Sequence, residues 1–301
     1  MPFGGTLSED LSVLDREVAS VISSIPRGKV TTIKTIAESL GDKRATLAVF
    51  LSLKKLKNRG IEGWHRVVRE NLQADPDAIP LLKAEGVTIR GNAVDRSFIT
   101  ERVRKSAILL RMRYAQRMMR DSLVLKEVED VRTAAGVDVA YVGDVAFGAC
   151  VVMDRNFNVV EKSVVKVKAL FPYIPTYLAF REFRPMYLAA RRCEFDVLFV
   201  DGHGLLHPEL FGEACHLGVA LRKPTIGAAK SLLVGEISGN KVFVNGIHLG
   251  WVLGGSYISP GNMISIDDSL KISKMFLLNR SQPEPLILAH MESKMASTKQ
   301  S

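Results

Sequence analysis

Residues 195–204, FDVLFVDGHG, decide the fold class of the larger part of this chain. The run is apolar and β-branched, and it ends abruptly on Asp201, which Gly202 and Gly204 follow. Such a run is typical of a buried parallel strand whose carboxyl end carries function. The stretch therefore predicts a parallel strand with Asp201 at its functional end.

The residues around this strand alternate between strand and helix patterns. A helical pattern precedes it at residues 178–194. Turn signals separate three earlier β-rich runs, residues 136–142, 145–154 and 159–170. A long basic segment, residues 101–128, is predicted to form one helix. This order predicts an α/β domain from about residue 96 to the end.

The front of the chain has a helical pattern instead. Residues 7–26 repeat apolar side chains at helical spacing and stop at Pro26. Residues 27–41 predict a turn, a threonine N-cap and a short helix closed by Gly41, and residues 42–60 predict a second, basic helix. Two short helices joined across a glycine predict a helix-turn-helix, with an ordinary helical hairpin as the alternative.

Composition narrows the class of protein. The chain has 301 residues, about two domains in length, and its 47% hydrophobic content is ample for folded cores. The net charge of +9 favours a polyanionic partner such as nucleic acid, although a basic, solvated surface would also explain it. Cys150, Cys193 and Cys215 show no metal-ligand spacing, and there is no secretion signal or membrane-length apolar run. We expect a cytoplasmic protein without a membrane partner.

Three acids stand where a structural role is hard to assign. Asp138 interrupts an apolar strand pattern, Asp201 ends another, and Glu182 lies in the helix between them. A buried acid is costly unless it is paired or binds a cation. The three could converge on a magnesium ion, while an N-cap for Asp201 and salt-bridged roles for the others remain open.

Several longer motifs resemble the endonuclease V family, which cuts at deaminated purines. In chain order they are GVDVAY, FPYIPTYLAFRE, VDGHGLLHP, ACHLGVALRKPTIGAAKSLLVGE and PEPLILAH. The resemblance covers about residues 100–290. It implies an RNase H-like fold and an Mg²⁺-dependent hydrolase, with Mn²⁺ as a substitute. The family usually cuts nucleic acid at the second phosphodiester on the 3′ side of inosine.

The resemblance also implies site residues. Asp138, Glu182 and Asp201 match the family's metal-binding acids, and Lys230 matches a lysine near the scissile phosphate. The wedge and pocket that handle the flipped base match four further positions, Tyr173, Leu178, Gly202 and Gly204. Three histidines share these motifs and have no firm metal role, His203, His207 and His216.

Two positions depart from the family pattern. Asn262 stands in place of a histidine that we expect near the metal centre, and an amide cannot shuttle a proton. Thr176 stands in place of a glycine and could narrow the base pocket. We expect both substitutions to affect the rate of cleavage and the choice of lesion.

The front segment resembles the DNA-binding domain of alkylguanine-DNA alkyltransferases over about residues 10–90. GWHRVV, residues 63–68, matches their Pro-Cys-His-Arg-Val motif, with Trp64 in place of the cysteine and Gly63 in place of the proline. The resemblance therefore implies an alkyltransferase-like module that binds a lesion without repairing it, because no thiolate is present. His65 and Arg66 would support the pocket.

Other positions of this module match DNA-contacting or catalytic residues. Arg44 matches a finger that enters the base stack, and Ile33 stands where a tyrosine assists base rotation. Glu85 and His65 match a relay that activates the missing cysteine. The predicted DNA-binding cations are Lys43, Arg44, Lys54 and Lys55.

Together these patterns predict two domains and one main function. Residues 1–95 form an alkyltransferase-like DNA-binding domain, and residues 96–301 form an endonuclease V domain. The expected activity is cleavage of damaged DNA 3′ to deoxyinosine by a monomer. A non-enzymatic damage-recognition protein and an inosine-specific ribonuclease remain alternatives.

Overall fold

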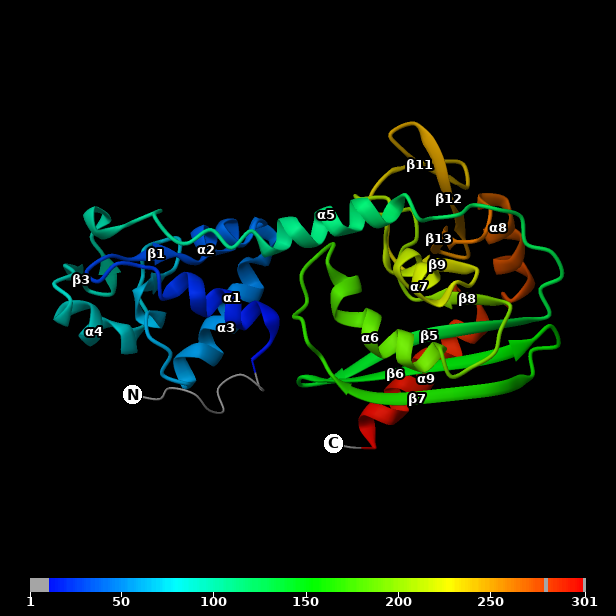
Figure 1. Ribbon diagram of the computed structural model, residues 1–301, viewed down its shortest axis with the longest axis horizontal. Coiled ribbons are helices and arrows are strands. Elements are labelled where there is room, and N and C mark those ends of the chain that lie inside the picture. The colour runs from blue at the N-terminus through cyan, green and yellow to red at the C-terminus, as the bar shows by residue number, and fades with distance from the viewer. Residues whose placement is uncertain (1–10, 279–280, 300–301) are drawn as a thin grey trace. The chain divides into compact units, whose positions relative to one another are not determined.

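The computed structural model describes residues 11–278 and 281–299, and the chain divides into two compact units (Figure 1). The first unit comprises residues 1–114 and 170–175, and the second comprises residues 115–169 and 176–301. The predicted domain boundary after residue 95 concerns the two family modules and stays a prediction. No helix within the described residues is long and apolar enough to cross a membrane.

The first unit is mainly helical, as predicted. Ser12 caps its first helix through a reciprocal capping box with Asp15. The predicted threonine cap is Thr32, which accepts from the Thr35 N–H, and Gly41 ends that helix with φ 107°. The elements are α1 (Val13–Ile22), β1 (Thr31–Thr32), α2 (Ile33–Leu40), η1 (Lys43–Ala45), α3 (Thr46–Asn58), η2 (Trp64–Arg66), β2 (Val67–Val68), η3 (Pro76–Ala78), α4 (Ile79–Ala84), β3 (Ile89–Arg90), β4 (Ala93–Val94) and η4 (Arg96–Phe98).

The pair α2–α3 has the predicted order of a helix-turn-helix. Residues 7–10 of the first predicted helix lie outside the described residues, and the described helix begins at Val13. The parallel pair β1–β2 and the hairpin β3–β4 complete the unit.

The second unit is built on a nine-stranded mixed sheet. Its strand order is β10-β11-β12-β13-β9-β8-β5-β6-β7, and among the described strands of this sheet only β5, β8 and β9 pair in parallel. The elements are β5 (Thr133–Val142), β6 (Val145–Asp154), β7 (Val159–Lys168), α6 (Leu178–Ala190), β8 (Val197–Val200), α7 (Glu213–Leu221), β9 (Thr225–Ala229), β10 (Glu236–Ser238), β11 (Lys241–Val244), β12 (Ile247–Leu253), β13 (Ser256–Asn262), α8 (Ile266–Met275) and α9 (Glu284–Thr298).

Helices cover both faces of this sheet. Alternate residues of β8 show the division, because Leu198 and Val200 pack with α6 and α7, whereas Val197 and Phe199 pack with α8 and α9. This layering confirms the predicted α/β class.

Two glycines let helices approach the sheet closely. A Cβ at Gly136 of β5 would lie 2.2 Å from the backbone of Pro285 in α9. A Cβ at Gly148 of β6 would lie 2.4 Å from the carbonyl oxygen of Pro185 in α6. The close approach of α6 and α9 places their side chains beside the ends of the strands.

The single long helix predicted over residues 101–128 is wrong. The helix α5 spans only Ile108–Arg120. The N–H groups of Ser106 and Ala107 bond to the Ser39 carbonyl instead of continuing a helix, and Ala107 has φ 53°. The sequence of this basic segment predicted a helix, but it did not predict the tertiary contacts that shorten the helix.

Candidate metal centre

Asp138 is a buried acid in the middle of the sheet, only 5% exposed. The Ser293 hydroxyl donates to its Oδ2 at 2.8 Å, and His290 Nδ1 lies 3.1 Å from the same oxygen. Burial and the nearby charge of Asp201 raise the pKa of Asp138. A divalent cation between the two aspartates would relieve that repulsion.

Asp201 lies beside Asp138 because of the strand register. Val137 of β5 pairs with Val200 of β8, so the next residue of each strand is an aspartate at the same edge. Lys230 Nζ lies 2.6 Å from Asp201 Oδ2, which places the predicted lysine at this centre. Gln282 donates to the Ala228 carbonyl at 2.9 Å and lies 3.5 Å from Asp201 Oδ1.

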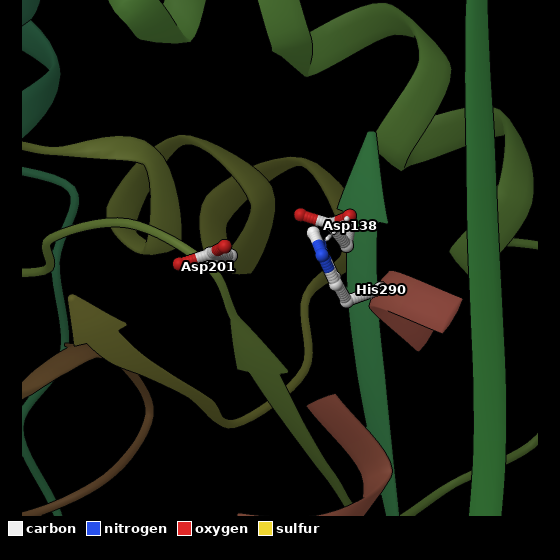
Figure 2. Close-up of side chains that lie close together, drawn as sticks. All are labelled: Asp138, Asp201 and His290. Carbon is white, nitrogen blue, oxygen red and sulfur yellow. Dashed lines mark hydrogen bonds and ion pairs between the residues drawn. The ribbon is translucent and has the colours of Figure 1, made fainter. Parts of the chain in front are cut away.

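A third side chain completes a possible ligand set (Figure 2). One ligand atom from each of Asp138, Asp201 and His290 lies within 4.8 Å of the others. His290 projects from α9 toward Asp138, while Asp201 faces them from the end of β8. The two carboxylates suit a hard divalent cation such as Mg²⁺ or Mn²⁺, and the imidazole adds a nitrogen donor beside them, so the residues present fit a divalent metal ion.

Glu182, the third predicted acid, is held next to a fourth. Its carboxyl is hydrogen-bonded to that of Glu213, the first residue of α7. Burial, with the charges of Asp138 and Asp201, raises the pKa of Glu182 to about 8. Glu182 therefore lies in the field of both aspartates, outside the three-residue ligand set.

Sequence reasoning missed His290, Ser293, Gln282 and Glu213. A signal for His290 was available, because it ends the motif PEPLILAH. Glu213 looks like an ordinary acid in the first turn of a helix, which is a favourable position on any helix. Its burial depends on packing between α6, α7 and the turn after β8, which no local pattern reports.

Asn262, which stands in place of a histidine expected near the metal, has structural partners. Its amide oxygen accepts from the Val124 N–H at 3.0 Å, and its own N–H donates to Thr225. The side chain therefore fastens the segment before β5 to β13. The histidine at the ligand set is His290, so Asn262 gives no reason to expect an impaired centre.

The predicted pocket residues occupy varied environments. Tyr173 is 58% exposed, as a wedge requires, and Leu178 is half-buried at the start of α6. Gly202 and Gly204 are needed for packing, since a Cβ at either would lie 2.1 Å from Glu213 Oε2 or the Pro260 carbonyl, respectively. The Gly204 N–H already donates to Ser259 at 2.9 Å. Their contact with a flipped base stays a prediction.

Thr176 has φ 70°, a backbone conformation that favours glycine. The family's glycine at this position suits that conformation. We expect Thr176→Gly to raise the free energy of unfolding of the second unit by about 1 kcal/mol, because the strain of a β-branched residue is lost. Urea unfolding measures this change. Thr176→Ala is the matched control and should gain less, and a loss of stability in the glycine variant would contradict the argument.

The three histidines in the family motifs have protein partners or apolar surroundings. His207 Nδ1 accepts from the Glu209 N–H at 3.2 Å, so its Nε2 donates to the Thr176 carbonyl. His216 packs against Phe180, Phe183 and Phe211, and burial lowers its pKa to about 4. Burial likewise lowers the pKa of His203 to about 4. The rings of His203 and His216 are therefore neutral at pH 7.

In the first unit, Trp64 lines a cavity of about 200 Å³ together with Ile33, Phe50 and Val68. Lys57 Nζ lies 5.0 Å from the centre of its ring, and ion pairs with Asp75 and Asp77 hold that lysine. The indole is half-buried and has an open side. The Trp64 ring therefore forms one side of the cavity and is not a fully buried core residue.

Glu85 organises the residues after Trp64. It accepts from Arg66 at 2.7 Å and from the Gly28 N–H at 2.9 Å, and its Oε1 lies 3.0 Å from His65 Nε2. Burial alone would raise the pKa of Glu85, but these bonds outweigh it and hold the value at about 2. Glu85 thus holds His65 and Arg66, the two residues that follow Trp64, in place.

Gly63 stands at the position of the proline in the alkyltransferase motif. Its φ is 89°, which proline cannot adopt, and a Cβ there would lie 2.6 Å from the Ile22 carbonyl oxygen. A proline at position 63 would therefore not fit this backbone.

The predicted DNA-binding cations are on or just before α3, and all are exposed. Arg44 pairs with Asp42 at 2.7 Å, Lys55 lies 3.8 Å from Asp15, and Lys54 lies 4.7 Å from the centre of the Phe50 ring. Asp42 and Asp15 are buried, whereas the side chains of Arg44 and Lys55 remain partly exposed and accessible to phosphates.

The α/β fold and the acid-rich centre define the class of this chain, a hydrolytic nuclease. The sequence model described as Endonuclease V matches residues 114–291, and the chain belongs to that family. A second model, the DNA-binding domain of 6-O-methylguanine DNA methyltransferase, matches residues 14–87. The chain is a DNA repair endonuclease with an N-terminal DNA-binding module.

Individual relatives agree with this organisation. The chain is 43% identical to Endonuclease V of Thermofilum pendens, over 67% of this chain and 91% of the relative. It is 33% identical to a bifunctional methyltransferase-like/endonuclease of Nanoarchaeum equitans, over 84% of this chain and 82% of the relative. A structure of Ciona intestinalis Endonuclease V with DNA containing inosine has a TM-score of 0.59 at 25% identity, covering 64% of this chain and 98% of that one.

Proposed function

We propose that this chain nicks DNA on the 3′ side of deoxyinosine, using a divalent metal ion, with Mg²⁺ as the natural choice. The observation that carries the proposal is the ligand set of Asp138, Asp201 and His290, in which the two aspartates follow paired residues of the parallel strands β5 and β8. The relative from Ciona intestinalis, with inosine-containing DNA bound, supports the choice of lesion.

The chain's own residues supply distinct parts of the chemistry. A bound metal would polarise the phosphodiester and activate water. Asp138 and Asp201 would hold it, and Ser293 fixes the orientation of the Asp138 carboxylate. Lys230 Nζ, exposed and 2.6 Å from Asp201, is placed to stabilise charge on the phosphoryl oxygens.

The proposal is tested with three matched substrates. DNA with one deoxyinosine, the same DNA with adenine, and RNA with one inosine are each incubated with the chain and Mg²⁺. We expect nicking of the inosine DNA. Cleavage of the RNA alone would identify an inosine-directed ribonuclease, and cleavage of none would favour a recognition protein.

For the first unit, we propose that the cavity beside Trp64 receives an extruded guanine carrying an alkyl group. The indole offers a flat apolar wall, and a residue without a thiol cannot accept the alkyl group. This unit would hold damaged DNA without changing it.

The salt dependence of DNA binding tests the contribution of α3. Replacing both Lys43 and Lys54 by alanine should reduce the slope of log affinity against log salt by about 1.8, since each lost phosphate contact contributes about 0.9. The control is Lys271→Ala, an exposed lysine of α8. Equal slopes for the double variant and the unaltered chain would mean that these lysines do not contact DNA.

A further inference from the structure

Glu213 is a fourth carboxylic acid at the metal centre, beside the three acids predicted from the sequence. It is the first residue of α7 and only 6% exposed. Its carboxyl is hydrogen-bonded to that of Glu182 on α6. Its Oε2 lies against Gly202, where a Cβ would be 2.1 Å away. One side chain thus contacts both the carboxyl of Glu182 and the turn that follows Asp201.

The stability of the fold does not explain an acid at this position. Glu213 Oε1 is buried and has no hydrogen-bond partner among the described residues. Such burial is costly, and an acid in the first turn would stabilise the helix equally well from an exposed position. The neighbours Ala214, Cys215 and Leu217 are fully buried and apolar or weakly polar. An apolar side chain would suit these surroundings better, so the acid points to a role at the centre.

We propose that Glu213 is a positioning residue of the metal centre, whose hydrogen bond holds the Glu182 carboxyl near Asp138 and Asp201 for metal binding. The inference rests on the proposed function and adds to it Glu182, which the family resemblance implies as a further metal-binding acid. Two carboxyl groups bond to each other only when one carries a proton. Glu213 is buried whereas Glu182 is only partly buried, so we assign the shared proton to Glu213, where a charge would be the more costly.

Two substitutions separate hydrogen bonding from shape. Glu213→Gln keeps a permanent donor to Glu182, and Glu213→Leu removes it while filling the same space. Mn²⁺ binding to the full chain without nucleic acid, followed by electron paramagnetic resonance of free Mn²⁺, gives the metal affinity. We expect the leucine variant to bind Mn²⁺ about 10- to 100-fold more weakly, the usual effect of losing a group that orients a ligand. The glutamine variant should stay within about threefold of the unaltered chain.

Two further measurements identify a positioning role. In a Glu182→Ala background, Glu213→Leu should have no additional effect on Mn²⁺ affinity, because Glu213 acts through Glu182. Thermal unfolding of the metal-free leucine variant should be unchanged or occur at a higher temperature. Glu284→Leu is the matched control, since Glu284 is also buried at the first position of a helix in this unit, and it should keep its Mn²⁺ affinity.

The outcomes separate this inference from the proposed function. Unchanged Mn²⁺ affinity in Glu213→Leu, or equal losses in the leucine and glutamine variants, would overturn the role of Glu213. Glu213→Met repeats the test if the leucine variant does not fold. An unaltered chain that neither binds Mn²⁺ nor nicks inosine DNA would instead refute the proposed function.

Discussion

Asp201→Ala should lose nicking of inosine DNA by about 1,000-fold or more, because the variant lacks an acid that we propose to hold the metal that stabilises the transition state. Its affinity for DNA should stay within about threefold, since phosphate contacts elsewhere supply most of the binding. Single-turnover nicking with Mg²⁺ gives the rate, and fluorescence anisotropy in Ca²⁺ gives the affinity.

The melting temperature of Asp201→Ala distinguishes a loss of nicking activity from misfolding. Asp201 contributes to the raised pKa of Asp138, so its removal relieves repulsion and should not lower the melting temperature. The matched control is Asp267→Ala, an exposed aspartate of α8, which should nick normally. Full nicking by Asp201→Ala would contradict the assignment of the centre.

Glu85→Ala should destabilise the first unit by about 3–5 kcal/mol, because it leaves the buried guanidinium of Arg66 without its carboxylate. Arg66 is 6% exposed and keeps a bond to the Ile25 carbonyl. Glu62→Ala is the matched control, since Glu62 also pairs with Arg66 but its side chain is 82% exposed. The control should lose less than about 1 kcal/mol. Urea unfolding followed by tryptophan fluorescence measures both, and equal losses would contradict the role of burial.

The contribution of Glu85 should also depend on pH. Its pKa falls from 4.5 to about 2 in the folded chain, so the folded state binds the proton less tightly than the unfolded state. The stabilisation is therefore fully present above about pH 4.5 and disappears as the pH falls toward 2. The difference in unfolding free energy between the unaltered chain and Glu85→Ala should shrink over that interval. A constant difference down to pH 2 would show that the ion pair is not its source.

Much of the sheet could be predicted because each strand carries its own pattern. The runs that became β5, β6, β7 and β8 are rich in β-branched residues and bounded by turn signals. The convergence of Asp138 and Asp201 followed from the family motifs, and the parallel register of β5 and β8 explains it. The order of the nine strands could not be read from local patterns, because pairing between distant strands depends on tertiary packing.

The residues of the metal centre that were not predicted from the sequence depend on how closely helices pack against the sheet. His290 reaches Asp138 because Gly136 allows α9 to cross β5 closely. Asn262 matched a position in the family motif, yet its side-chain amide oxygen accepts a hydrogen bond from the Val124 N–H. A motif identifies which residue types are present, whereas their partners follow from packing.

The most direct test of the metal-dependent activity is single-turnover nicking of a DNA duplex with one deoxyinosine, in Mg²⁺ and in excess chelator, with the cut mapped to one nucleotide. We predict one nick at the second phosphodiester on the 3′ side of the lesion in Mg²⁺ and none in chelator. Nicking that persists in chelator, or that is equal in DNA without deoxyinosine, would contradict the account.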